Sequence, residues 1–469
     1  MYPRVNKFQV SSFKIFIVHI SIYCLLFTIS VDAQNYSVSP YSRYGIGELQ
    51  DNGFAKSAAL GGSAIALQND TLTPFFINAL NPASYASIRL TTFEAGAFNN
   101  TTMLRDDANS SVKNAASLEY ISLAVPFTRW WSGCFGLMPY SSVGYKISDQ
   151  KTIDSVGTVN YLYQGTGGIN RLYFGNAIRI KNLYLGVNVS YLFGSMNYVE
   201  RDLFSDGISY NTKITNSTTV NDIYFDYGLQ YTIIIDSLRE KRTVKRDSLG
   251  HKIKMPRGKK DIDDVKITFG LTTALKSNLS AVSSTLIQRY TLDASNDEII
   301  IDTIQNTVNK HGVITLPFSY GAGVAVKKGE KFLFTGDYSI QNWSDFSLFE
   351  ENANLKNSMK ISFGAQYVPG KQSDFRSSYW KRVNYRIGMK YYKSYLNFPN
   401  SEIDEYVLSL GLGLPVGRMR VLQQFSMLNV AFELGQNGTT ANNLLKEQFF
   451  RVTLGVTIND RWFIKSRFD

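Results

Sequence analysis

The chain has 469 residues, of which 44% are hydrophobic, with 30 Phe, 29 Tyr and 35 Gly, and it carries a formal net charge of +11. This aromatic and glycine content is high for a soluble enzyme and is typical of a transmembrane β-barrel, where aromatic side chains line the membrane interfaces and glycines occupy one side of the strands. Only two cysteines are present, and one lies in the first 33 residues, so disulfides are excluded as the basis of the fold.

Residues 1–33 have the pattern of a secretory signal peptide. Arg4, Lys7 and Lys14 form a basic start, residues 15–31 are mainly apolar, and Ala33 supplies the small residue before the cleavage site. A retained transmembrane helix is the alternative, which the polar residues that follow disfavour. After the signal no run of about eighteen apolar residues occurs, so no transmembrane helix is expected.

In residues 34–88, apolar and polar residues do not alternate, and this segment is predicted to form an N-terminal hatch, or plug. The segment holds a stretch of small residues, then Phe75, Phe76 and Ile77. An apolar segment of this kind would not stay free in the periplasm, so we expect it to fill the lumen of a barrel. The three apolar side chains are then either contacts for a hydrophobic ligand or the anchor of the hatch on the inner wall.

The predicted hatch contains Asn81, Pro82 and Ala83 shortly before the first strand. Asn81 is expected to bond the local backbone, and Pro82 to direct the chain into the first strand.

Residues 89–469 show a period of two, which predicts long strands. From Leu183 to Gly194, apolar residues alternate with polar residues or glycine, and the same alternation recurs elsewhere. Strands of soluble proteins usually have about five or six residues, whereas a tilted strand needs about 9 to 11 residues to cross a bilayer. Only closed barrels satisfy every backbone group there. The predicted fold is therefore all-β: a transmembrane antiparallel β-barrel of about fourteen strands.

The predicted strands are 89–104, 117–128, 133–148, 159–180, 183–202, 221–236, 264–284, 312–327, 331–345, 357–369, 382–397, 404–415, 422–437 and 446–460. We number the connections between successive predicted strands in chain order. Short connections, such as 181–182 after the fourth strand, have even numbers. The polar segments 105–116, 202–220 and about 281–310 are connections with odd numbers. Since periplasmic turns are short and outer loops are long in such barrels, the even connections are assigned to the periplasm. Four tryptophans near that end, Trp130, Trp131, Trp380 and Trp462, suggest a periplasmic aromatic girdle.

Residues 237–263 concentrate Lys and Arg in an even connection and are predicted to be a basic periplasmic insertion. The insertion is either a solvated hairpin or a docking site for an acidic periplasmic partner. A basic chain can also bind nucleic acid, but an exported chain rarely meets it, so no nucleic-acid partner is expected. Outer-membrane lipid and anionic lipopolysaccharide are the expected electrostatic partners.

The N-terminal motifs resemble those of the FadL family of outer-membrane transport proteins. In that family a signal peptide precedes a hatch with a small-residue stretch, an aromatic-rich segment and an Asn-Pro-Ala motif, followed by fourteen strands. The matching positions here are Ala58 to Ala66, Phe75 to Asn78, and Asn81 to Ala83. The resemblance implies the outer membrane of a Gram-negative bacterium. It also implies passive, hatch-gated uptake of hydrophobic small molecules such as long-chain fatty acids.

The third predicted strand contains Gly133, Gly136, Pro139 and Gly144. Proline donates no ladder hydrogen bond and glycine tolerates bulges, so a local break is expected near Pro139. Members of the FadL family kink this strand, and the resemblance implies a lateral opening through which a hydrophobic ligand leaves into the membrane. A bulge that only shapes the barrel is the alternative. Transport further predicts a continuous apolar groove from the outer loops to Pro139.

The chain also resembles type IX secretion shuttle porins, which are related to FadL but bind protein cargo. The alternative function is therefore a non-transporting, partner-binding barrel subunit of an outer-membrane secretion or protein-assembly complex, with a periplasmic or outer-membrane protein as partner. The long even connections, 237–263 and 370–381, favour this alternative.

An enzymatic function is not expected. After the signal, the only histidines are His251 and His311, so a Ser-His-Asp site would have to use one of them. No Cys/His spacing suits zinc and no glycine-rich phosphate loop is present. We therefore predict no catalytic residues, no metal site and no cofactor.

Overall fold

The computed structural model describes residues 37–51, 53–69, 75–154, 157–206, 208–235, 245–246, 252–253, 265–370, 377–416 and 425–460. The predicted signal peptide, most of the predicted basic insertion and Trp462 lie outside these residues. Within the described ranges, no helix is long and apolar enough to cross a membrane.

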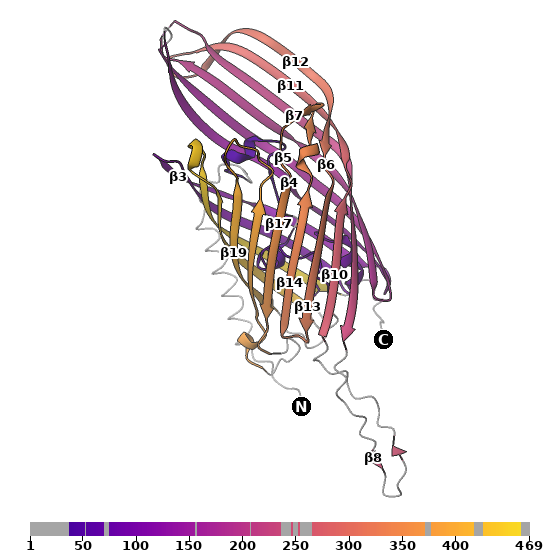
Figure 1. The fold of residues 1–469 in the computed structure, drawn as a ribbon. Helices are drawn as coiled ribbons and strands as arrows, with labels where there is room; N and C mark the ends of the chain where they lie inside the picture. Colours follow the sequence, from indigo (N-terminus) through magenta and orange to yellow (C-terminus); the bar gives the residue numbers. More distant parts are fainter. Residues whose placement is uncertain are drawn as a thin grey trace, which may run out of the picture.

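Long strands form most of the structure (Figure 1). They are β2 (Thr91–Arg105), β3 (Ser110–Pro126), β4 (Trp131–Ile153), β5 (Gly157–Ile180), β6 (Leu183–Phe204), β7 (Asn211–Ile235), β10 (Val265–Ala274), β11 (Ser277–Leu292), β12 (Glu298–Leu316), β13 (Ser319–Lys328), β14 (Phe332–Gln341), β17 (Ser358–Tyr367), β18 (Asn384–Lys393), β19 (Asp404–Val416), β20 (Phe425–Gly438) and β21 (Lys446–Asp460).

The remaining elements are short. They are η1 (Pro40–Arg43), β1 (Glu48–Leu49), α2 (Ala55–Ala58), η2 (Pro82–Ser87), β8 (Lys245–Arg246), β9 (Lys252–Ile253), η3 (Trp343–Asp345), β15 (Ser347–Leu348), β16 (Glu351–Asn352), η4 (Tyr379–Lys381) and η5 (Ala441–Asn443).

The long strands close into one antiparallel barrel of fourteen wall strands. Both β10 and β11 pair with β7, so they are two halves of one wall strand. Likewise β12 pairs with β11 and β13 pairs with β10. The barrel closes where β2 pairs with β21, from Thr91 opposite Asp460 to Arg105 opposite Lys446. The predicted fold and strand number are confirmed.

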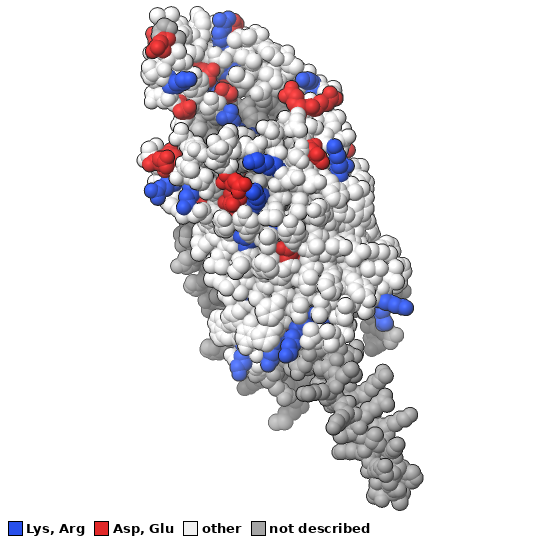
Figure 2. All heavy atoms as spheres, viewed as in Figure 1, with Lys and Arg blue, Asp and Glu red and all other residues white. Residues whose placement is uncertain are grey.

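Alternation gives the barrel two different faces. Phe363, Leu408 and Leu434 point outward and are about half exposed, at 56%, 48% and 58%, while their neighbours in the strands, which are mostly polar or glycine, face the lumen. On the face drawn in Figure 2, charged side chains gather over the upper part and along the lower rim, and the zone between them is largely uncharged. An apolar band of this kind is where hydrocarbon contacts an outer-membrane β-barrel.

The predicted outer loops turned out to be strand. Segments 105–116, 202–220 and 281–310 lie mostly in β2, β3, β6, β7, β11 and β12. Of these, β7, β11 and β12 run far past the ends of β13 to β19 (Figure 1). Their many Thr and Ile residues suit paired strands. The prediction missed them because a sheet outside the membrane needs no apolar face, so the alternation disappears while the backbone pairing continues.

Trp130, Trp131 and Trp380 are exposed, at 56%, 38% and 63%, and they flank the turns on the side assigned to the periplasm. Trp343 is fully buried and stacks on Tyr395 with ring centroids 4.5 Å apart. It belongs to the core that fills the upper lumen.

Candidate functional site

The N-terminal segment (the described parts of residues 37–90) packs directly on the inner wall. A Cβ atom at Gly388 would lie 2.1 Å from the backbone nitrogen of Gly61, and one at Gly186 would lie 2.4 Å from the backbone nitrogen of Ala83. Only a residue without a side chain lets the two backbones approach so closely. The lumen-facing glycines of the wall are therefore contact points for this segment.

Polar side chains of the wall hold the segment in place. Asp337 on β14 accepts hydrogen bonds from the backbone N–H groups of Ala64 (2.5 Å) and Ile65 (2.8 Å). Asn459 on β21 accepts from the N–H of Phe75 (3.0 Å) and donates to its carbonyl oxygen (3.1 Å). These bonds satisfy backbone groups that would otherwise be buried without partners.

Phe75, Phe76 and Ile77 are all buried, but none of them lines the main cavity of the lumen. Phe76 lies beneath the ammonium group of Lys56, which is 3.2 Å from the ring centroid. Burial, together with the positive charges of Arg386 and Lys327, lowers the pKa of Lys56 well below its usual value. This placement favours the anchor alternative over ligand contact.

Asn81 is fully buried and joins three parts of the molecule. Its side-chain amide donates to the carbonyl oxygens of Ile65 (2.7 Å), Leu229 (3.3 Å) and Leu271 (3.3 Å), and its side-chain oxygen accepts from the N–H of Ala83 (3.1 Å). The predicted local bond is thus present at the start of η2, and two wall bonds are added to it. Asn81 and Pro82 also lie against Gly228 of β7.

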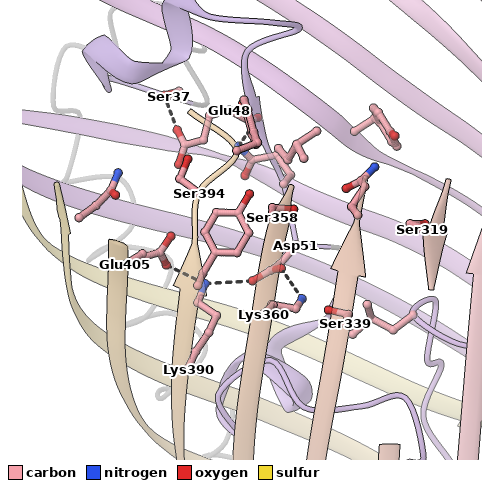
Figure 3. A pocket seen from close by; sticks show the side chains of 18 of the residues that line it. Ser37, Glu48, Asp51, Ser319, Ser339, Ser358, Lys360, Lys390, Ser394 and Glu405 are labelled. Atoms are coloured by element: carbon pink, nitrogen blue, oxygen red, sulfur yellow. Dashed lines mark hydrogen bonds and ion pairs between the residues drawn. The ribbon is translucent and has the colours of Figure 1, made fainter. Parts of the chain in front are cut away.

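A network of ion pairs links the N-terminal segment to β17, β18 and β19. Asp51 binds Lys360 at 2.9 Å and Lys390 at 3.1 Å, and Lys390 also binds Glu405 at 2.8 Å (Figure 3). Burial opposes ionisation of Asp51, but the two ammonium groups outweigh it and hold the pKa of Asp51 below its usual value of 3.8. The network is therefore charged at neutral pH.

The ion pairs border a cavity of about 320 Å³ in the lumen. Besides aromatic residues, its lining includes Glu48, Glu433 and Arg451. Ser37 donates to Glu48 at 2.5 Å (Figure 3). Volumes of about 300 to 1,000 Å³ are usual for small-molecule sites, but this lining is charged rather than continuously apolar.

The wall has a break between β3 and β4. β3 pairs with β2 along nearly its whole length, yet it pairs with β4 only from Ile121 to Pro126, opposite Leu137 to Ser132. Beyond Leu137, β5 is the one wall strand that still pairs with β4 among the described residues, and a register shift lies between Pro139 and Ser141. Proline removes a ladder donor at this point.

The four residues of the predicted lateral opening lie at different points of β4 relative to the break. Gly133 and Gly136 lie in the regular part of the β3–β4 ladder, below the break. Pro139 lies at the register shift. A Cβ atom at Gly144 would be 1.8 Å from the carbonyl oxygen of Ser37, so this glycine lets the N-terminal segment pass.

The inner side of the break is partly occupied. β1 pairs with β4 at Ser141 and Ser142, and the N–H of Gln50 donates to the carbonyl oxygen of Tyr140 at 3.0 Å. The N-terminal segment thus satisfies part of the strand edge that β3 leaves free.

The charged cavity was not anticipated. Lys360 and Lys390 stand at lumen-facing positions of alternating strands, where most neighbours are small or uncharged, and such a charge requires a buried partner. These two lumen-facing lysines were the sequence feature that could have indicated a charged cavity. The partner, Asp51, lies more than 300 residues away in the sequence and is recognised only in the fold. Within the described ranges, no group of three or more His, Cys, Asp or Glu side chains could hold a metal ion.

Solved structures with a similar fold include a FadL homologue and two toluene transporters. A Pseudomonas aeruginosa FadL homologue is 10% identical, with a TM-score of 0.53, over 89% of this chain and 100% of its own. The Pseudomonas putida toluene transporter TodX is 14% identical, with a TM-score of 0.52, over 88% and 99%. The Ralstonia pickettii toluene transporter TbuX is 12% identical, with a TM-score of 0.50, over 88% and 100%. The FadL-like barrel architecture is confirmed by this likeness.

No curated protein sequence matches the chain. The resemblance to type IX secretion shuttle porins stays a prediction. The model of the BamG family matches residues 14–255 and 237–469, which together span nearly the whole sequence. The chain is an outer-membrane β-barrel, and it belongs to the BamG family.

Proposed function

We propose that this chain is a partner-binding barrel, a subunit of an outer-membrane secretion or protein-assembly complex. The observation that carries the proposal is the open edge of β12 in the sheet that extends beyond the barrel. Along residues 298–313, β12 pairs with β11 on one side, and on the other side the described residues offer it no strand until β15 pairs at Ile314 and Thr315.

The open edge of β12 carries several exposed apolar side chains. Ile299, Ile301, Ile304 and Val308 are 49%, 45%, 57% and 62% exposed. A long apolar edge strand is a template for pairing with another chain, and proteins usually protect such edges with charges. A partner that adds a strand here would satisfy the free backbone groups and cover the isoleucines.

The opposite edge of the same extension, formed by the upper part of β4, supports this reading. Once β4 has left β3, its free edge carries Lys146, Asp149 and Lys151. Charges of this kind block edge-to-edge pairing. On β12, by contrast, Glu298 and Asp302 are ion-paired with Arg201, Lys213 and Arg289 of the same sheet, which leaves Lys310 as its other charged residue. This contrast favours a specific partner at β12 over general aggregation.

The lumen supports the same proposal. A transporter of hydrophobic molecules needs an apolar route, whereas this cavity is lined by Asp51, Lys360, Lys390 and Glu433. Moving an apolar molecule past desolvated ions, or burying those ions against it, is unfavourable.

Purification of the tagged, full-length protein from native membranes in mild detergent, with identification of copurifying proteins and lipids, tests the proposal. We expect a stoichiometric protein partner that the double substitution Ile301→Lys and Ile304→Lys removes. Ile208→Lys is the matched control, because Ile208 is 87% exposed on the same extension but lies in a turn outside β12. Recovery of lipid without a protein partner would contradict the proposal.

Transport of a hydrophobic small molecule, such as a long-chain fatty acid, is the second candidate. The break between β3 and β4 beyond Leu137 favours it, because a gap in the hydrogen-bonded wall offers a lateral exit to the membrane. Two proteins of similar fold are described as toluene transporters.

Uptake of a long-chain fatty acid and of toluene by whole cells tests this second candidate. If transport uses the break, Pro139→Val, or a disulfide that locks the N-terminal segment to the wall, lowers uptake of at least one of the two compounds. Unchanged uptake of both would exclude the route.

A further inference from the structure

A concave apolar groove crosses the outer, lipid-facing side of the wall between the β2–β3 hairpin and β17. We propose that this groove binds lipopolysaccharide, with an acyl chain in the groove and a phosphate group between Arg105 and Lys446. This site is separate from the lumen and from the edge of β12.

The groove has a volume of about 790 Å³. Met103 and Val112 form one side, Phe363 and Met389 form the other, and Leu434 is among the residues of the floor. These side chains are between 37% and 64% exposed. A flat barrel wall contacts lipid everywhere, but a concave wall surrounds an acyl chain on several sides and so gains contact area for one molecule.

The break in the wall explains why this surface is concave. Between Ser110 and Tyr120, β3 is paired with β2 but not with β4. The β2–β3 hairpin therefore departs from the line of the wall, and its tip lies apart from the main barrel in Figure 1. Outward residues of the hairpin, such as Met103, then face those of β18 and β19 across a hollow.

Two cations stand at the outer end of the groove. Arg105 and Lys446 are directly opposite each other on β2 and β21, two residues beyond Met103 and Gln448, which both line the groove. Like charges directly opposite each other across two strands are destabilising. In the described part of the chain, neither side chain has an ion pair or a hydrogen bond. The pair is thus positioned for an anion supplied from outside the protein.

Asp106 and Asp107 follow Arg105 in the β2–β3 turn, but neither is ion-paired with Arg105 or Lys446 among the described residues. Asp106 accepts hydrogen bonds from the N–H groups of Ala108 and Asn109 within its own turn. On the far wall, Glu402 binds Lys393 at 2.7 Å, and Asp404 accepts from the hydroxyl of Tyr391 at 3.1 Å.

The position of the groove on the barrel identifies lipopolysaccharide as the lipid. The groove and the two cations lie toward the β2–β3 turn, an odd connection on the side opposite the short turns, and this is the outer face of the barrel. The outer leaflet of this membrane presents lipopolysaccharide, whose lipid A portion combines phosphate groups with several acyl chains. A cation pair above an apolar groove matches both features, and basic pockets beside a membrane recognise lipid phosphates in this way.

Native mass spectrometry of the purified, full-length protein, after delipidation and addition of lipid A, phosphatidylglycerol or phosphatidylcholine, tests the proposal. We expect lipid A to bind with the highest affinity. Arg105→Ala combined with Lys446→Ala should weaken lipid A binding by tenfold or more. Leu434→Trp, which fills the floor of the groove, should weaken it with the cations intact.

Lys276→Ala together with Lys331→Ala is the control, because it removes two positive charges that lie between strands and do not line the groove. Lipid A affinity should then change less than twofold. Correct folding of each variant is checked by the slower migration of the heated barrel during electrophoresis. Equal binding by wild type and the double cation variant would overturn the proposal, as would equal affinity for phosphatidylglycerol or a copurifying protein that covers the groove.

Discussion

The lower lumen and the outer extension share some strands, such as β7, but differ in which groups pair with their backbone and cover their apolar side chains. In the lumen, the N-terminal segment covers the inner wall through close backbone contacts and hydrogen bonds, including those of Asn81 and Asp337. In the extension, the edge of β12 and its exposed isoleucines have no such cover among the described residues.

This difference indicates where each part of the molecule acts. A lumen filled by the chain itself is a structural core, and its residues should control stability. A sheet that leaves one edge open is a surface for binding, and its residues should control association with little effect on stability. Substitutions in the two regions can therefore separate the two roles.

The largest effect is expected where the N-terminal segment approaches the wall most closely. Gly388→Val should lower the free energy of unfolding by about 3 kcal/mol, because the new side chain would overlap the backbone of Gly61. Urea unfolding of the reconstituted barrel measures this loss of unfolding free energy. Gly336→Val is the control: its Cβ meets only the outward ring of Phe363, at 3.1 Å, and it should cost less than about 1 kcal/mol. Equal losses would contradict close packing in the lumen.

Asn81→Ala should have the next largest effect. The substitution leaves the N–H of Ala83 without its buried partner and removes one of two side-chain hydrogen bonds to the carbonyl oxygen of Ile65, the other being donated by Gln230. Together these losses cost about 2 kcal/mol. The same unfolding assay applies. Asn114→Ala, which removes exposed hydrogen bonds at the β2–β3 hairpin, should change stability by less than about 0.5 kcal/mol.

A smaller and pH-dependent effect is expected at Asp51. Because its pKa is depressed in the folded protein, its ion pairs contribute fully above the usual carboxyl value of 3.8, and the contribution is lost as the pH falls below that value. Asp51→Asn should cost about 1 kcal/mol at neutral pH, since the carboxylate is partly exposed.

Urea unfolding of wild type and Asp51→Asn, measured from neutral pH to below pH 3.8, tests this pH dependence. Their difference in unfolding free energy should shrink as the pH falls. A difference that stays constant with pH would show that Asp51 acts through packing and not through charge.

The smallest effect on stability is expected at β12. Ile301→Lys and Ile304→Lys replace exposed side chains and should change the free energy of unfolding by no more than about 0.5 kcal/mol, while retention of a protein partner is lost. A large loss of stability instead would mean that these side chains belong to the core of the extension.

The sequence by itself predicted the fold class and all fourteen wall strands. Lipid and lumen impose opposite demands on alternate residues, and this leaves a period of two in each strand, as in residues 183–194. It also predicted the irregularity near Pro139, because proline removes a ladder hydrogen bond whatever the neighbouring strand is.

Only the tertiary structure decided the rest. The upper halves of β7, β11 and β12 are strands because partner strands pair with them, and pairing outside the membrane leaves no apolar alternation to detect. The link between Asp51 and the lysines of β17 and β18 depends on a contact across more than 300 residues. Long-range contacts of this kind carry no local sequence signal, because each strand satisfies its own periodicity whatever fills the lumen.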